Sequence, residues 1–135
     1  MNFREAKYGV AFAACAFNLV EFTIGAETGG DTINVGIVVK DARGNPPTGP
    51  CILRAFLSDV ATGLGISAVA TTTAPAVGTD GSLLSIDVTG KMMTLQTDAE
   101  GAVDINVIQT AAQTYYLVVI LPDGSIAVSG AITFA

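Results

Sequence analysis

The chain has 135 residues and a formal net charge of −6; half of its residues are apolar and only 13% are charged. This length supports one hydrophobic core rather than two. Soluble domains carry about a quarter charged residues, so we expect part of the apolar surface to be covered by copies of the chain or by a partner. The six basic residues are scattered along the sequence, which argues against a surface for nucleic acid.

Residues 1–15 do not follow the alternation of a strand, and we interpret them as an N-terminal arm outside a domain formed by residues 16–135. The apolar end of this segment is similar to the end of a bacterial lipoprotein signal. Glu5 and Gly9 interrupt the apolar run that a signal requires, so we expect no cleavage. No stretch approaches the roughly 18 apolar residues of a membrane span.

Cys15 and Cys51 could form at most one disulfide, and whether they pair is left open. Neither has a nearby Cys or His at a spacing typical of metal ligands. We therefore interpret both as small buried hydrophobic residues.

The first strands follow from alternation and composition. Period-2 alternation predicts a strand from Ala16 to Ile24, and β-branched residues predict a central strand from Thr32 to Lys40. Asp41 to Pro47 ends that strand, because proline cannot donate to a β-ladder and Gly and Asn permit positive φ angles. The next strand is predicted from Cys51 to Ser58.

The region from Asp59 to Thr79 is small and polar, and we expect one irregular strand around Ile66 to Thr71 between two long loops. Pro122-Asp123-Gly124 predicts a tight hairpin, in which Asp-Gly supplies the left-handed positions of a two-residue turn. Five further strands are predicted: Ser82 to Val88, Lys91 to Thr97, Ala102 to Ile108, Thr114 to Leu121 and Ser125 to Thr133.

No helix of ten or more residues is required anywhere, and turn signals recur at the spacing of a sandwich. The pattern therefore predicts an all-β fold, a Greek-key β-sandwich.

The chain contains no His, the commonest general base and the usual partner of a nucleophilic Ser or Cys. We therefore expect no enzyme, and assign no catalytic, cofactor-binding or metal-binding residue. Four aspartates next to Gly, or two or three residues before it, are interpreted as turn residues whose carboxylates accept nearby backbone N–H groups. These are Asp41, Asp80, Asp98 and Asp123.

A calcium site at Asp98, Glu100 and Asp104 is the alternative for the acidic residues, since hard cations take oxygen ligands from loops. The ligand spacing of an EF-hand is missing, and Asp104 should point off a strand. The turn interpretation is therefore preferred.

Two loops with glycine, Gly63-Leu64-Gly65 and Thr79 to Ser82, are similar to phosphate-binding loops, but neither leads into a helix. Tyr115 and Tyr116 could form a platform for a sugar or peptide, yet adjacent strand residues face opposite sides. We expect one tyrosine in the core, with its hydroxyl bonded near a corner, and the other exposed.

From Val35 to Pro46 and from Thr97 to Gly101, the chain resembles bacterial and phage immunoglobulin-like domains. These domains show a strand, a D-x-x-G-N-P turn and a T-D-x-x-G hairpin. The resemblance covers residues 32–121 and implies an immunoglobulin-like sandwich.

After residue 20, the chain is also similar to small tailed-phage virion proteins. The similarity rests on Phe22 to Glu27, Ile33 to Val35, Phe56 to Asp59, Gly78 to Gly81 and Leu121 to Ala135. It implies a capsid decoration or cement protein, made in the host cytoplasm, that binds and stabilises the outer surface of the phage head. The implied partners are the major capsid protein or another virion protein, and further copies in a homo-oligomer. No cofactor, nucleic acid or membrane partner is expected.

An N-terminal arm can add to the edge of a partner's sheet through main-chain hydrogen bonds. Four aromatic residues are predicted to include the contacts to the capsid or to a neighbouring copy: Phe3, Tyr8, Phe12 and Phe17. The alternative is a module associated with the tail, neck or fibre, whose loops 59–65 and 71–81 bind a host-cell surface or carbohydrate.

Overall fold

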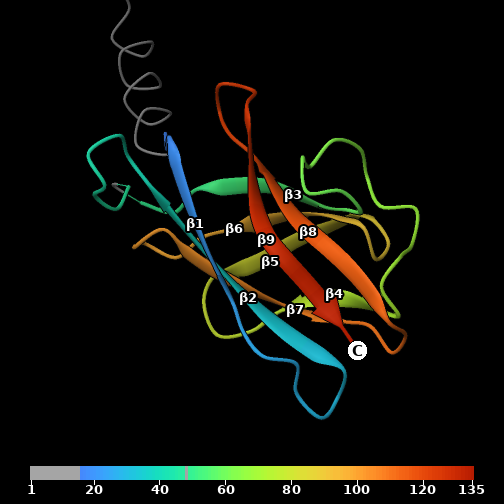
Figure 1. Ribbon diagram of the computed structural model, residues 1–135. Coiled ribbons are helices and arrows are strands. Elements are labelled where there is room, and N and C mark those ends of the chain that lie inside the picture. Colours follow the sequence, from blue (N-terminus) through green and yellow to red (C-terminus); the bar gives the residue numbers. More distant parts are fainter. Residues whose placement is uncertain (1–15, 48) are drawn as a thin grey trace, which may run out of the picture.

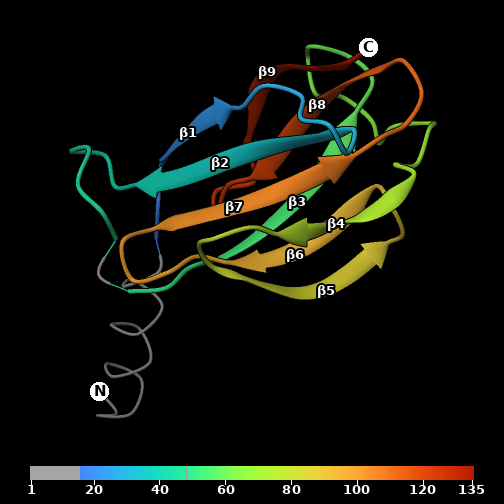
Figure 2. The same ribbon diagram turned by 90° about the horizontal axis from the view of Figure 1, so that it is seen from below.

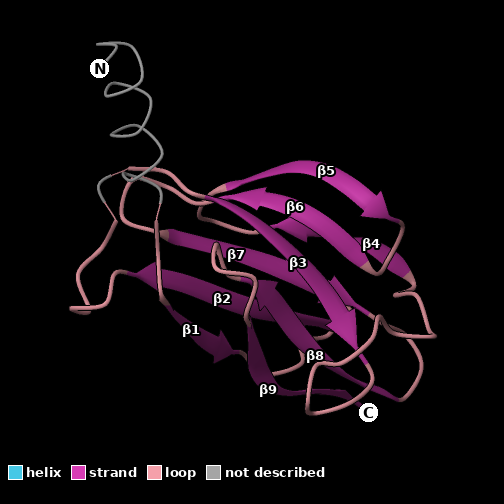
Figure 3. Cartoon of the chain, turned by 90° about the horizontal axis from the view of Figure 1, so that it is seen from above, coloured by secondary structure: helices cyan, strands magenta, loops and turns pink. Residues whose placement is uncertain are grey.

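The computed structural model describes residues 16–47 and 49–135, which form nine strands in two antiparallel sheets (Figure 1). No helix occurs in this part of the chain (Figure 3). The strands are β1 (Leu19–Ile24), β2 (Thr32–Lys40), β3 (Ile52–Ser58), β4 (Thr73–Val77), β5 (Ser82–Val88), β6 (Met92–Gln96), β7 (Ala102–Ile108), β8 (Gln113–Ile120) and β9 (Ile126–Phe134). The predicted arm, residues 1–15, lies outside the described residues.

One sheet has the strand order β1-β2-β7-β4 and the other has β5-β6-β3-β8-β9. The two sheets form the layers seen in Figure 2. Many neighbours are distant in the sequence: β2 pairs with β7, and β3 pairs with β6 and β8. The prediction of an all-β, immunoglobulin-like sandwich is confirmed.

The core lies between the sheets and consists of every second residue of the inner strands. In β2, Val35 and Val39 are fully buried, while Asn34 and Gly36 face outward from the four-stranded sheet. Burying one such aliphatic side chain contributes about 1.5–3 kcal/mol. The buried rows of the inner strands are Ile33, Val35, Ile37 and Val39; Val103, Ile105 and Val107; Leu53, Ala55 and Leu57; Leu117 and Val119.

The prediction of a strand around Ile66 to Thr71 is wrong, because these residues form a loop. Ser67 is instead held in a loop, because its backbone N–H donates to the Leu57 carbonyl (2.7 Å) and its hydroxyl donates to Asp59 (2.5 Å). The strand of this region is β4, which contains Pro75. β4 tolerates a proline because it is an edge strand that pairs only with β7 among the described strands.

The turns Asp41 to Asn45 and Asp98 to Ala102 have the same backbone geometry. In the first, Gly44 N–H donates to Asp41 O (3.0 Å) and Asp41 N–H donates to Asn45 O (2.9 Å). The corresponding distances in the second turn are 3.2 and 2.9 Å. Gly44 and Gly101 adopt φ angles of +82° and +83°, a left-handed conformation that favours glycine.

The turn between β8 and β9 follows the same pattern. Gly124 N–H donates to Leu121 O (2.9 Å), and Leu121 N–H donates to Ser125 O (2.8 Å). Only Gly124 has a positive φ angle here, so the connection has three residues rather than the predicted two-residue Asp-Gly turn. The hairpin itself is confirmed by the pairing of β8 with β9.

Candidate functional site

Three of the four turn aspartates act as predicted. Asp41 Oδ1 accepts the backbone N–H of Arg43 (2.9 Å) and of Asn45 (3.0 Å). Asp98 Oδ1 makes the same two bonds in its turn, both at 2.9 Å. Asp123 Oδ1 accepts the Ser125 backbone N–H at 2.9 Å. These carboxylates therefore stabilise turns.

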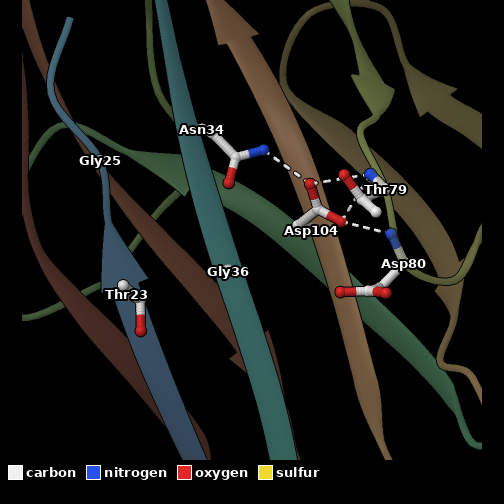
Figure 4. A pocket seen from close by; sticks show the side chains of 7 residues that line it. All are labelled: Thr23, Gly25, Asn34, Gly36, Thr79, Asp80 and Asp104. Atoms are coloured by element: carbon white, nitrogen blue, oxygen red, sulfur yellow. Dashed lines mark hydrogen bonds between the residues drawn. The ribbon is translucent and has the colours of Figure 1, made fainter.

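The fourth, Asp80, belongs to a polar groove on the outer side of the four-stranded sheet (Figure 4). The groove has a volume of about 360 Å³, and its floor includes two glycines that leave the sheet backbone accessible. It is lined by Thr23, Gly25, Asn34, Gly36, Thr79, Asp80 and Asp104.

Asp104 is the central polar residue of this groove and is only 8% exposed. Its Oδ1 accepts the backbone N–H groups of Thr79 (2.8 Å) and Asp80 (2.6 Å), and its Oδ2 accepts Asn34 Nδ2 (2.7 Å). Burial by itself would raise the pKa of Asp104, but these donors outweigh it and hold the pKa below 3.8. Asp104 therefore stays ionised at neutral pH.

The loop with the Thr79-Asp80-Gly81-Ser82 sequence does bind an anion, and that anion is the Asp104 carboxylate of the same chain. Two successive backbone N–H groups directed at one carboxylate form an anion-binding nest. Gly78 is required for this arrangement, because a Cβ at Gly78 would overlap Asp104 Oδ2. No local sequence pattern marks the roles of Gly78 and Asn34, since both act on Asp104, which is distant in the chain.

The calcium alternative has no support in this geometry. The oxygens of Asp104 face N–H donors, and Asp98 Oδ1 is occupied by its own turn. Within residues 16–47 and 49–135, no three His, Cys, Asp or Glu side chains are grouped so that they could hold a metal ion. The same residues include no helix long and apolar enough to cross a membrane.

The loop after β3, one of the two predicted binding loops, folds back on the domain. Asp59 Oδ1 accepts the Ser67 hydroxyl, and Asp59 Oδ2 accepts Ala68 N–H at 2.8 Å. The Ser67 bond is the main reason that the pKa of Asp59 lies below 3.8. Farther along the loop, a Cβ at Gly63 would lie 2.5 Å from Val128 Cγ2, so this loop packs directly on β9.

The side of the five-stranded sheet that faces away from the core is unusually apolar. The pairing places Phe56, Val118 and Val128 in one row across β3, β8 and β9. Ile52 is 59% exposed at the start of β3, and Leu64 of the covering loop is 72% exposed. We name this surface the apolar outer face; it comprises Ile52, Phe56, Leu64, Val118, Ile120, Ile126 and Val128.

Tyr115 is the core tyrosine, and its ring packs edge-to-face on Phe134 with centroids 6.3 Å apart. The prediction that its hydroxyl is hydrogen-bonded near a corner is wrong: the buried Tyr115 hydroxyl has no partner in the described part of the chain. Burial first, and then the charge of Asp59, raises the pKa of Tyr115 above 10. Tyr116 is partly buried rather than exposed.

The predicted partner contacts Phe3, Tyr8 and Phe12 lie outside the described residues. Phe17 is 5% exposed and belongs to the core, and this position explains the aromatic side chain without a partner. Cys51 is buried as expected, with its thiol 3.7 Å from the Gly49 carbonyl oxygen. Cys15 lies outside the described residues.

No model of a known protein family matches this chain. A search of curated proteins finds no match either.

Proposed function

We propose that the chain is a non-enzymatic structural protein of a tailed-phage particle, a capsid decoration protein that binds the outer surface of the head and stabilises it. The partner is the major capsid protein or another virion protein. Phe3, Tyr8 and Phe12 of the N-terminal segment provide contacts to this partner or to a neighbouring copy.

The observation that carries the proposal is the exposed part of the apolar outer face, formed by Ile52, Leu64 and Ile126, on a sandwich whose turn aspartates are engaged in internal hydrogen bonds. Large exposed apolar patches on soluble proteins mark interaction surfaces. The choice of partner rests on the resemblance of sequence motifs after residue 20 to those of phage virion proteins.

Quantitative mass spectrometry of phage particles from the source of the sequence tests this function. A decoration protein is expected at a copy number comparable to that of the major capsid protein, and particles without it should lose their DNA at a lower temperature. Absence of the chain from purified particles would overturn the proposal.

A second candidate is a module of the tail, neck or fibre that binds carbohydrate. The polar groove favours it, because Thr23, Asp80 and the open backbone at Gly36 line the groove, and its rim includes Thr79 and Asp80 of the predicted binding segment 71–81, which the structure shows to contain β4 (Figure 4). Such a module would be present in few copies, and it should bind a glycan array in a manner that Asp80→Ala abolishes. Glu100→Ala, which changes an exposed acidic residue outside the groove, is the matched control.

A further inference from the structure

We propose that the apolar outer face is the docking surface for residues 1–15 of a second copy of this chain. This inference deepens the proposed structural role and rests on it, because it names the neighbouring copy as the partner of the N-terminal segment.

The apolar outer face has exposed apolar side chains that contact with a partner would bury. An antiparallel sheet with one solvated face normally carries polar side chains on that face. Here, Ile120 lies opposite Ile126 in the β8–β9 pair, and Phe56 lies opposite Val118 in the β3–β8 pair. Charged groups border this surface: Arg54 lies between Ile52 and Phe56 on the same side of β3, opposite Thr94, whose hydroxyl donates to the Asp87 carboxylate (2.7 Å). The loop around Gly63 lies against Val118, Val128 and Ile126 and covers Val118 completely, whereas Ile52 and Ile126 remain 59% and 38% exposed.

The chemistry of residues 1–15 matches this surface. Arg4 and Lys7 against Glu5 give the segment a net charge of +1, which leaves −7 for the rest of the chain. The segment is therefore attracted to the domain of any copy. Its apolar residues can fill an apolar face: Phe3, Tyr8, Val10, Ala11, Phe12, Ala13 and Ala14.

The segment also leaves the domain at a suitable place. Asn18 N–H donates to Lys40 O (3.0 Å), which fixes the start of β1 beside the end of β2. Figure 1 shows this point at the same end of the sandwich as the start of β3 and the β8–β9 turn. Fifteen extended residues span about 50 Å, more than the length of a nine-residue strand, so the segment can reach a neighbouring molecule.

The direction in which the chain enters β1 favours docking of the segment on a second copy rather than on its own domain. β1 runs from this end into the four-stranded sheet, whereas the apolar outer face belongs to the other layer and faces away from β1. To reach its own apolar outer face, the chain would have to turn back around the edge of the sandwich where β1 lies beside β9, close to Phe17, which is anchored in the core. A contact between the segment of one copy and the face of the next is heterologous, and it can repeat into rings or arrays, as a protein that covers a shell requires.

Photo-crosslinking of the full-length chain tests the contact directly. A photoreactive phenylalanine analogue replaces Phe12, and light and ¹⁵N-labelled proteins are mixed before irradiation. We expect crosslinks that join position 12 of an unlabelled chain to β3, β8 or β9 of a ¹⁵N-labelled chain, and crosslinks with the labels exchanged. Crosslinks found only between peptides of the same isotope, crosslinks to the four-stranded sheet, or no crosslinks to the domain would each overturn the inference.

Substitutions in the full-length chain provide an independent measurement. Ile52→Asp and Phe12→Asp are each expected to weaken self-association in sedimentation velocity by at least about tenfold, since each places a charge in an apolar contact. Leu19→Asp is the matched control, because Leu19 is 45% exposed on the other sheet and its change should leave association unaltered. Circular dichroism verifies that each variant folds.

The two proposals can fail separately. A full-length chain that remains monomeric at high concentration and still binds phage particles would overturn this inference and leave the proposed function intact. A chain that self-associates through residues 1–15 but is absent from phage particles would overturn the proposed function and leave this inference intact.

Discussion

Asp104 accepts the backbone N–H of Asp80 at 2.6 Å, and this bond ties the inner strand β7 to the connection between β4 and β5. Thr79 and Asn34 donate to the same carboxylate. An acidic residue that the sequence placed on the surface of a strand therefore organises one side of the four-stranded sheet.

Asp104→Asn tests this role. The substitution keeps the shape but turns one acceptor oxygen into an N–H donor, which must face the N–H groups of Thr79 or Asn34. We expect the free energy of unfolding to fall by about 1–3 kcal/mol in urea denaturation. Glu100→Gln removes a charge from an exposed turn position and should have little effect. Equal stability of both variants would contradict the assigned role.

Stability is expected to fall in acid. Hydrogen bonds hold the pKa values of Asp59, Asp87 and Asp123 below 3.8, and the pKa of Asp104 shifts the same way despite burial. A group whose pKa is lower in the folded state stabilises the fold above its unfolded pKa, and this contribution is lost as the pH falls through the folded pKa.

These four groups should therefore leave stability constant between pH 7 and pH 5 and reduce it below about pH 4. Urea midpoints measured across this range provide the test, and Asp104→Asn should show a shallower acid loss than the unaltered chain. Stability that rises on acidification below pH 4 would show that the aspartates are not stabilised in this way.

Tyr115→Phe is expected to preserve or increase stability by about 1 kcal/mol, because it removes a buried hydroxyl without a partner and keeps the ring contact with Phe134. Tyr116→Phe, at the partly buried neighbouring position, is the control. Thermal unfolding of both variants measures the difference. A marked loss for Tyr115→Phe would mean that the hydroxyl is hydrogen-bonded in solution.

Gly44 and Gly101 occupy equivalent positions in matched turns, yet alanine should cost more at Gly101. Both have positive φ, which costs about 1–2 kcal/mol for other residues. A Cβ at Gly44 meets nothing within 4 Å, whereas at Gly101 it would lie 2.6 Å from Val39 O. We expect Gly101→Ala to lose at least about 1 kcal/mol more than Gly44→Ala in chemical denaturation. Equal losses would mean that the neighbouring backbone yields without cost.

Local patterns were sufficient for much of the fold. The β-branched run in β2 and the alternation in β3 depend on side chains only two residues apart, so their faces follow from the pleat of a strand. The turns at Asp41 and Asp98 are equally local, because each carboxylate bonds backbone N–H groups within four residues.

The region between β3 and β5 could not be predicted in this way. Ile66 to Thr71 has a composition compatible with a strand, but Asp59 captures Ser67 and Ala68 in a loop. Pro75 predicts an interruption of any strand, but β4 accommodates it because β4 lies at a sheet edge. Both outcomes depend on neighbours that the local sequence does not specify.

By itself, the sequence determined an all-β domain, most of its strands and the turn role of Asp41, Asp98 and Asp123, since each rests on periodicity or on hydrogen bonds between close neighbours. Only the tertiary structure decided that Asp104 is held by Asn34, Thr79 and Asp80, and that the five-stranded sheet presents an apolar outer face. Those features arise where segments 24 to 70 residues apart in the chain meet, and strand register and sheet packing determine which side chains come together there.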